Sequence, residues 1–265
     1  NEADAFIIMK PMLELYKGTY IFDHIYILLK EGFLMDNKTQ NTPTDKQKTD
    51  LTKTDYLTEQ ETNTSGGSAE RLRRQMAFCL EIDKEKFIGR QTYLSDGERK
   101  ENDAEHAWHM AVMTLLLSEY SNQEIDVLKT MGMLLIHDLV EIYAGDTYAY
   151  DEEGKKTQKA RETAAADRLF GILPEDQGSR LRSWWEEFDE GDTPEARFAR
   201  AMDHIQPLML NASTHGKSWE EHGIRLSQIL NRNKETDKGS SQLWDYAYNN
   251  FILPNLAAGK ITPDE

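Results

Sequence analysis

Apolar residues recur at helical spacing over most of the chain, from Ala69 towards the C-terminal end. No segment shows a convincing alternation of apolar and polar residues, the pattern expected of a half-buried strand. The pattern therefore predicts an all-α fold, a helical bundle. The expected helices cover residues 69–82, 103–120, 124–144, 157–173, 174–189, 194 onward, 217–233 and 241–256.

The chain divides into three regions by composition. Residues 1–35 are apolar and aromatic and predict an N-terminal helical arm that needs a partner surface. Residues 36–68 are rich in Thr, Asn, Asp, Lys and Gln and end in Ser-Gly-Gly-Ser, which is typical of a flexible polar linker. Residues 69–265 form the expected helical domain.

Two helix starts carry clear signals. Asn102 and Glu105 have the spacing of a capping box, which predicts a helix that begins at residue 103. Thr193 followed by Pro194 combines an N-cap residue with proline at the first helical position. Both predicted helices carry residues that matter for the chemistry considered next.

The most informative pair is His137-Asp138, which lies inside the apolar run of residues 131–140. The run indicates a buried helix, and a carboxylate buried there is costly unless a positive charge compensates it. An adjacent histidine and aspartate are best compensated by a divalent metal, which accepts imidazole nitrogen and carboxylate oxygen together. The pair therefore predicts a metal site.

Two other segments can complete the ligand set. His106 opens an apolar helix, and Asp203 lies in a downstream amphipathic segment. Two imidazoles and two carboxylates suit one divalent ion: Mn, Co, Fe, Zn or Mg. Each residue alone is more often a hydrogen-bonded core residue, and His109 and His204 are expected to be of that kind.

The ordered set His106, His137-Asp138 and Asp203, spread over successive helices, resembles the HD-domain metal-dependent phosphohydrolases. The segments 89–94, 99–106 and 137–146 are similar to the 5′-deoxynucleotidase branch of that family, and the resemblance extends over about residues 69–255. It implies that His106, His137, Asp138 and Asp203 are the metal ligands. It also implies that Glu141 and Asp146 act near the attacking water and the leaving group, and that Arg90 contacts phosphate. Gln91 replaces an aromatic residue of some relatives, which leaves base and sugar selectivity open.

Elementary chemistry allows the same roles. In one continuous helix Glu141 would lie one turn beyond His137, where a carboxylate can shuttle a proton. Gly145 predicts a helix stop that turns Asp146 back towards the helix end, and the guanidinium of Arg90 suits a phosphate ester. Without the His-Asp context, a solvated helix-face charge, a turn former and a surface arginine would be the preferred interpretations of these three residues.

Charge and cysteine content narrow the partners and the compartment. The net charge of −16 argues against a nucleic-acid polymer or an anionic membrane as partner, but not against a mononucleotide. The single cysteine, Cys79, excludes internal disulfides and is expected to be a buried thiol in a reducing compartment. No secretory signal or spanning segment is visible, and position 1 is not Met, so the natural start can lie upstream. The expectation is a cytoplasmic homodimer.

The favoured function is a metal-dependent phosphomonoesterase that hydrolyses (deoxy)nucleoside 5′-monophosphates to nucleoside and phosphate. The residues alone support metal-assisted hydrolysis of an anionic ester, and the resemblance supplies the substrate class. Two alternatives stay open. One is another HD-type phosphohydrolase, a phosphodiesterase or a nucleotide pyrophosphate hydrolase, and the other is a non-catalytic nucleotide-sensing module that binds a metal.

Overall fold

The computed structural model describes residues 66–145 and 152–264 of the chain. The predicted arm (1–35) and nearly all of the predicted linker lie outside these residues. The first part of the domain contains α3 (Gly66–Glu81), η2 (Ile82–Phe87), β1 (Gly89–Tyr93), β2 (Lys100–Asn102), α4 (Asp103–Leu117), η3 (Ser118–Tyr120), α5 (Val127–Ile136) and α6 (Glu141–Ala144). The second part contains α7 (Glu152–Phe170), α8 (Glu175–Glu190), α9 (Pro194–Ser213), α10 (Lys217–Glu221), α11 (Leu226–Arg232), α12 (Thr236–Gly239), α13 (Ser241–Ala247), η4 (Tyr248–Ile252) and α14 (Leu253–Ala257).

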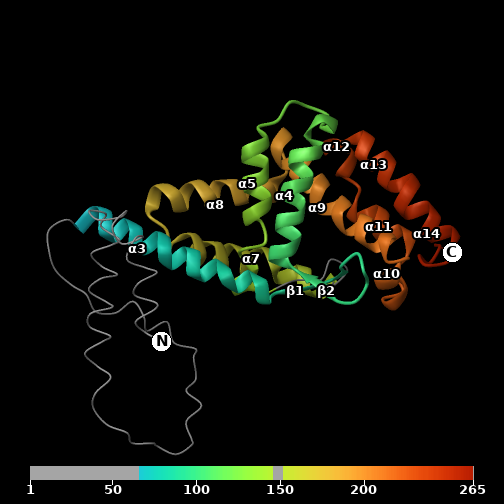
Figure 1. Ribbon diagram of the computed structural model, residues 1–265, viewed down its shortest axis with the longest axis horizontal. Coiled ribbons are helices and arrows are strands. Elements are labelled where there is room, and N and C mark those ends of the chain that lie inside the picture. Colours follow the sequence, from blue (N-terminus) through green and yellow to red (C-terminus); the bar gives the residue numbers. More distant parts are fainter. Residues whose placement is uncertain (1–65, 146–151, 265) are drawn as a thin grey trace, which may run out of the picture. The chain divides into compact units, whose positions relative to one another are not determined.

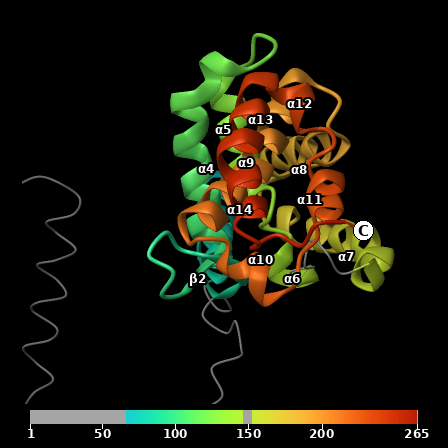
Figure 2. The same ribbon diagram turned by 90° about the vertical axis from the view of Figure 1, so that its right-hand side faces the viewer.

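The long helix α9 is the centre of the bundle. Its start has the predicted form, because the Thr193 side chain accepts a hydrogen bond from the backbone N–H of Ala196 and Pro194 occupies the first turn. It packs against α4, α5, α8 and α12, and the C-terminal helices α13 and η4 cover another side of it (Figures 1 and 2). Phe198, Ala199 and Met202 are fully buried along it. A helix whose apolar residues are buried on every side lies in the interior of the protein. The polar residues of α9 therefore lie in a dry environment.

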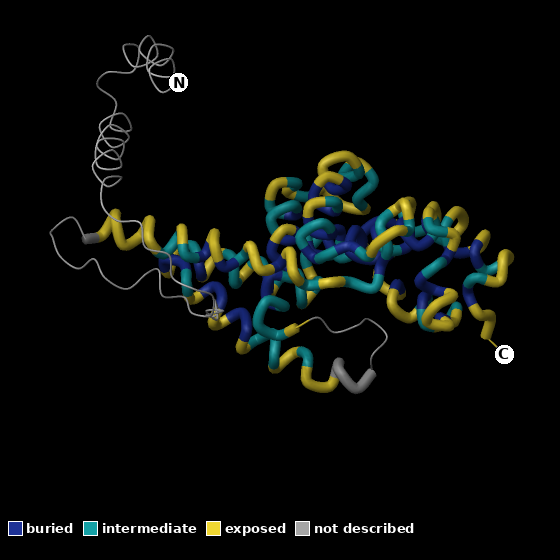
Figure 3. The backbone as a smooth tube through the Cα atoms, turned by 60° about the horizontal axis from the view of Figure 1, so that its bottom comes forward, coloured by how far each residue is buried: buried dark blue, intermediate teal, exposed yellow. Residues whose placement is uncertain are grey.

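Helix α4 is fixed at its start by the predicted capping box. Asn102 accepts a hydrogen bond from the backbone of Glu105, and the Glu105 side chain accepts one from the backbone of Asn102. Met110 and Met113 then pack into the core shared with α5 and α9. The buried stretches run through the middle of the bundle, whereas exposed residues follow its outer helices (Figure 3). The capping box therefore fixes the residue at which α4 begins.

The all-α prediction is confirmed, with one small addition. β1 and β2 form a two-stranded antiparallel sheet that the sequence pattern did not indicate. The strands are short, five and three residues, and mostly half-buried rather than alternating. Such strands lack the period that sequence analysis detects. Their placement matters because β2 leads directly into α4.

The predicted helix over 124–144 is wrong in its most important part. α5 ends at Ile136, His137 is its C-cap residue, and a separate short helix begins at Glu141. Between them the backbone makes hydrogen bonds to the third residue back, including Glu141 N–H to Asp138 O at 2.9 Å. The apolar character of the run hid this break, because a buried turn and a buried helix look alike by composition.

Other boundaries also differ. Residues 66–68, expected to end the linker, belong to α3, and α7 begins at Glu152, before the expected helix start at residue 157. The helix expected over 217–233 is divided into α10 and α11, because Gly223 between them has a positive φ of 59°. Cys79 is exposed rather than buried. Trp185 is buried, and Trp184 packs against the core.

Within the described residues, none of the helices combines the length and the apolar content that crossing a lipid bilayer would require.

Candidate metal centre

Three of the four predicted ligands converge. His106 comes from α4, His137 from the end of α5 and Asp203 from the middle of α9, and each offers one ligand atom within 4.8 Å of the other two. The Nε2 atom of His106 lies 3.1 Å from Oδ1 of Asp203, and that of His137 lies 3.8 Å from the same oxygen. All three residues are buried. The three residues, which are 31 to 97 positions apart in the sequence, thus meet at one carboxylate oxygen.

The ring nitrogens not facing Asp203 are held by protein groups. His106 donates from Nδ1 to the Gln206 side-chain oxygen at 2.9 Å, and His137 donates from Nδ1 to the backbone oxygen of Leu134 at 2.9 Å. A proton on Nδ1 leaves Nε2 of each ring facing the centre, where its lone pair is free whenever the ring is neutral. This is the arrangement by which outer hydrogen bonds orient imidazoles that bind a metal.

A group of three acceptors is unstable without a positive charge between them. Nε2 of His137 is buried and makes no hydrogen bond among the described residues. Burial opposes a charge on this ring, but the carboxylates of Asp138 and Asp203 outweigh that effect and raise the pKa of His137 to about 9. Burial and the nearby Arg90 lower the pKa of His106 to about 4, so that ring stays neutral. The centre therefore attracts positive charge, and two imidazoles with a carboxylate fit a divalent metal.

Asp138, the fourth predicted ligand, lies beside this group and is not one of the three residues that converge. Its Oδ2 is 3.0 Å from Nε2 of His137 and 2.9 Å from the guanidinium of Arg90. Burial raises the pKa of this carboxyl, but His137 and Arg90 together hold it below its usual value. Because His137 ends α5, Asp138 projects from a turn and reaches the same space as its neighbour. In a continuous helix, adjacent side chains point about 100° apart.

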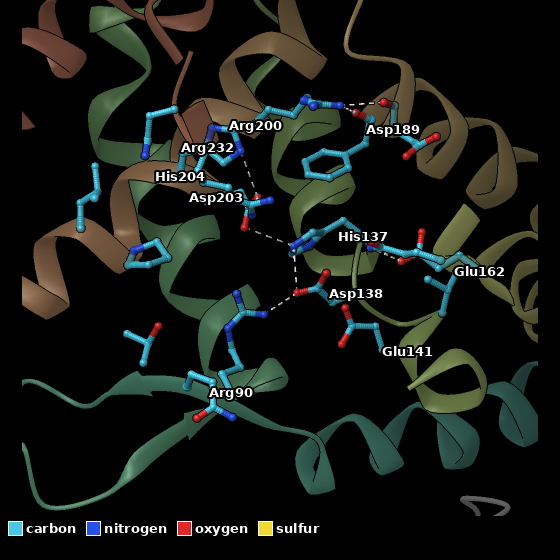
Figure 4. Close-up of a pocket in the computed structure, with 18 of the residues that line it drawn as sticks. Arg90, His137, Asp138, Glu141, Glu162, Asp189, Arg200, Asp203, His204 and Arg232 are labelled. Atoms are coloured by element: carbon cyan, nitrogen blue, oxygen red, sulfur yellow. Dashed lines mark hydrogen bonds and ion pairs between the residues drawn. The ribbon is translucent and has the colours of Figure 1, made fainter. Parts of the chain in front are cut away.

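Arg90 reaches the centre from β1, as Figure 4 shows. Its guanidinium contacts Asp138 at 2.9 Å, Asp103 at 3.1 Å and Glu101 at 3.5 Å, and the side chain is 16% exposed. The prediction placed Arg90 against a phosphate. In the structure Arg90 lies among carboxylates and lines the cavity, and its contact with a phosphate stays a prediction.

Glu141 lines the cavity at the start of α6, and the carboxyl of Asp103 hydrogen-bonds with it. Glu141 was expected one helical turn beyond His137 on the same helix. This expectation is wrong, because α5 ends and the chain turns between His137 and Glu141. The predicted helix stop at Gly145 is confirmed, with φ at 76°. Asp146, the other predicted catalytic acid, lies outside the described residues.

Gln206 and Glu101 support the centre and were missed by the sequence analysis. Gln206 accepts from His106 and donates to the Glu101 carboxylate at 2.9 Å, and both side chains are fully or almost fully buried. Gln206 also donates to Nδ1 of His109 at 3.2 Å. A signal was available, because Gln206 lies three residues after Asp203 and so on the same face of α9.

The two other histidines near these segments are not part of the group. His109 is bonded to Gln206, and His204 has its Nδ1 2.9 Å from the hydroxyl of Thr236. Burial lowers the pKa of His109, and burial with Arg232 lowers that of His204 to about 3. Both agree with the expectation that they are hydrogen-bonded neutral side chains.

The centre opens into a cavity of about 270 Å³, near the lower end of the ~300–1,000 Å³ common for ligand sites. Its aromatic wall includes Trp185, Phe188 and Trp219, and the Phe188 ring lies 4.8 Å from the His137 ring. Its polar wall includes three arginines and five carboxylates: Arg90, Arg200, Arg232, Asp138, Glu141, Glu162, Asp189 and Asp203. The aromatic side chains suit an apolar ring, and the arginines suit an anionic group.

Comparisons with known proteins find similar chains. A solved structure described as a predicted metal-dependent phosphohydrolase from Magnetospirillum magnetotacticum MS-1 is 43% identical, with a TM-score of 0.70, and the match covers 73% of this chain and 97% of that one. The protein named 5′-deoxynucleotidase HDDC2 of Homo sapiens is 28% identical over 118 residues, 44% of this chain and 56% of that protein. The HDDC2 protein of Xenopus laevis is 27% identical over 112 residues, 42% of this chain and 54% of its own length.

The chain thus spans about half the length of the curated relatives it matches. The model of the HD domain matches residues 82–244, which include His106, His137, Asp138 and Asp203. This match covers more than half of the sequence. The chain belongs to the HD-domain family.

Proposed function

We propose that this protein is a metal-dependent phosphomonoesterase that hydrolyses (deoxy)nucleoside 5′-monophosphates to nucleoside and phosphate. The observation that carries the proposal is the meeting of His106, His137 and Asp203 at one buried point that opens into a cavity lined by aromatic side chains, carboxylates and three arginines. The names of the relatives, a metal-dependent phosphohydrolase and 5′-deoxynucleotidases, support the reaction and the substrate class.

The proposed metal ligands are His106, His137, Asp138 and Asp203, which hold one divalent ion: Mn, Co, Mg, Fe or Zn. When bound, such a metal lowers the pKa of its water ligand towards neutrality and so supplies the nucleophile. The mixed nitrogen and oxygen donors favour an ion that accepts both kinds.

The proposed roles of the other residues follow from their positions. Glu141 handles the proton of the leaving group, since it lines the cavity next to Asp138. Arg90 holds the phosphate on the β1 side, which requires its bond with Asp138 to give way to the ester. Asp146, outside the described residues, is proposed to orient the attacking water.

The proposed partner is a small nucleotide, with no nucleic-acid polymer or membrane, and the proposed compartment is the cytoplasm. The single free cysteine supports the compartment, because no internal disulfide can form. The proposed domain plan has residues 1–35 as an arm, 36–68 as a linker and 69–265 as the hydrolase domain. Helix α3 begins at Gly66, within the last residues of the proposed linker.

We also propose a homodimer, which the exposed apolar residues of two neighbouring helices support. Helices α4 and α5 lie side by side (Figures 1 and 2), and their outer faces expose Trp108, Val112, Leu115, Leu116, Leu128 and Leu135. Several large apolar side chains exposed together mark an interaction surface more often than a solvated face.

The first test is a phosphate-release screen of nucleoside 5′-monophosphates with each of the five metals, with cyclic and bis-phosphorylated nucleotides as controls. Asp138→Ala should lose both bound metal and phosphate release, because it removes a ligand beside His137. Asp245→Ala, an exposed substitution on α13, is the matched control. Turnover by a metal-free Asp138→Ala protein would refute the proposal, and turnover of cyclic nucleotides alone would favour a phosphodiesterase.

Glu141→Gln should keep the metal and lower kcat by about 10²–10⁴-fold, the usual contribution of a general acid or base. The change keeps the size of the side chain and removes its ability to exchange a proton. Metal content by elemental analysis and steady-state kinetics check both parts, with exposed Glu119→Gln as control. A wild-type kcat in the Glu141→Gln protein would show that the proton is handled elsewhere.

Gln206→Leu should weaken metal binding by about 10–100-fold, the common effect of losing an outer hydrogen bond to a ligating histidine. The change frees the His106 ring to rotate and leaves the buried Glu101 carboxylate without its donor. Competition with a chelator measures the metal Kd, and Gln75→Leu on α3 serves as control. Equal metal affinities of the two variants would contradict a positioning role for Gln206.

Sedimentation equilibrium should give about twice the 30.6 kDa mass of the chain. The double substitution Leu116→Glu and Leu128→Glu should produce a monomer, because charges on the α4–α5 surface oppose its burial. Tyr246→Glu, at an exposed residue of α13, should leave the dimer intact. A wild-type protein that sediments as a monomer would exclude the dimer.

A further inference from the structure

The cavity next to the metal centre contains three guanidinium groups. Among the described residues, Arg90, Arg200 and Arg232 line it, and no lysine does. An anionic substrate must find its positive partners among these groups and the metal. Their existing bonds differ, and those bonds decide which arginine can accept an incoming anion.

Arg90 is already surrounded by negative charge. It contacts Asp138, Asp103 and Glu101 within 3.5 Å, and Asp103 and Glu101 are fully or almost fully buried. One guanidinium carries one positive charge, which these carboxylates share. An anion that approached Arg90 would meet the same carboxylates.

Arg200 is bonded to the main chain. Its guanidinium donates to the backbone oxygens of Asp189 at 2.7 Å and Phe188 at 3.3 Å, which belong to the last turn of α8. These carbonyls have no partner within the helix. The group therefore closes the C-terminal end of α8, and a move towards a ligand would expose that end.

Arg232 is the least committed of the three. It stands at the end of α11, its side chain is 39% exposed, and its one recorded hydrogen bond among the described residues joins it to Oδ2 of Asp203 at 3.2 Å. A guanidinium has five N–H donors in a planar fork. Most of them remain available to the cavity.

The position of Arg232 relates it directly to the metal centre. It bonds one oxygen of Asp203, while the other oxygen of the same carboxylate faces Nε2 of His106 and His137. Figure 4 shows Arg232 beside Asp203 and Arg90 beside Asp138, so the two arginines contact different carboxylates of the site. An anion held at the centre therefore lies within reach of a cation that comes from α11.

We propose that Arg232 forms an anion subsite that binds the phosphoryl group of the substrate on the α11 side of the metal centre. This inference rests on the proposed phosphoester hydrolysis and adds a binding residue to it. Arg232 and Arg90 then hold the phosphoryl group from different elements, and Arg232 is the stronger partner because fewer carboxylates compete for it. Its planar fork suits two phosphate oxygens at once.

A purely structural role for Arg232 would consist of neutralising Asp203. The two roles differ in a measurable way. Loss of a neutralising group changes metal binding and leaves the affinity for phosphate at saturating metal unchanged. Loss of an anion-binding group weakens phosphate binding even when every site contains metal.

The test is calorimetric titration of inorganic phosphate into the full chain saturated with the divalent metal that gives full occupancy. Arg232→Gln should raise the phosphate Kd about tenfold or more, as expected for a lost charge-assisted hydrogen bond. Lys234→Gln removes the same charge from an exposed residue two positions away that does not line the cavity, and should leave the Kd unchanged. Metal content and thermal unfolding are measured on the same samples.

Arg232→Lys provides a second variant that keeps the charge without the fork, and its phosphate Kd should lie between those of wild type and Arg232→Gln. Equal phosphate Kd values for Arg232→Gln and Lys234→Gln would overturn the subsite. If wild type then still hydrolyses nucleoside monophosphates, the proposed function survives that failure. Conversely, Arg232-dependent phosphate binding in a protein that hydrolyses no nucleotide would support the subsite and refute the proposed function.

Discussion

The metal centre of this domain depends on one electrostatic contact, the approach of two imidazole Nε2 atoms to the Asp203 carboxylate. His106 and His137 present their Nε2 atoms to a single oxygen from 3.1 and 3.8 Å. Three acceptors in a dry interior repel one another unless a cation stands between them. The bundle holds them together because α4, α5 and α9 share an apolar core that includes Met110, Met133 and Met202. Core packing thus maintains an arrangement of charges that requires a cation.

A second layer of charge surrounds this contact. Burial raises the pKa of Glu85, Glu101 and Asp103 to about 7 in each case, so these carboxyl groups ionise less readily than exposed ones. Arg90 offsets part of their charge, and Glu101 also anchors Gln206, which orients His106. The carboxylates beneath the centre and the histidines within it are therefore one connected system. A substitution in either layer affects the other through Arg90 or Gln206.

The break after His137 gives the site its shape. If α5 continued, His137 and Asp138 would point in directions about 100° apart. The turn brings the Asp138 carboxylate to 3.0 Å from the His137 ring and starts α6 at Glu141, so that all three residues line one cavity. Here the end of α5 lets two consecutive residues reach one centre. The irregular backbone here therefore has a direct chemical consequence.

The sequence by itself determined the helical class, the caps at Asn102 and Thr193, and the residues whose chemistry suggested a metal. These features are local, since periodicity, capping and residue type are set by neighbours along the chain. It placed His137-Asp138 in a continuous helix and Cys79 in the core, because composition records apolar content and not direction or exposure. The partners of each group come from distant segments: Gln206 for His106, Asp103 and Glu101 for Arg90, and Asp203 for Arg232. Only the tertiary structure decided these pairs, because they form where separate helices pack together. A pattern of residues along the chain does not specify which helices pack against each other.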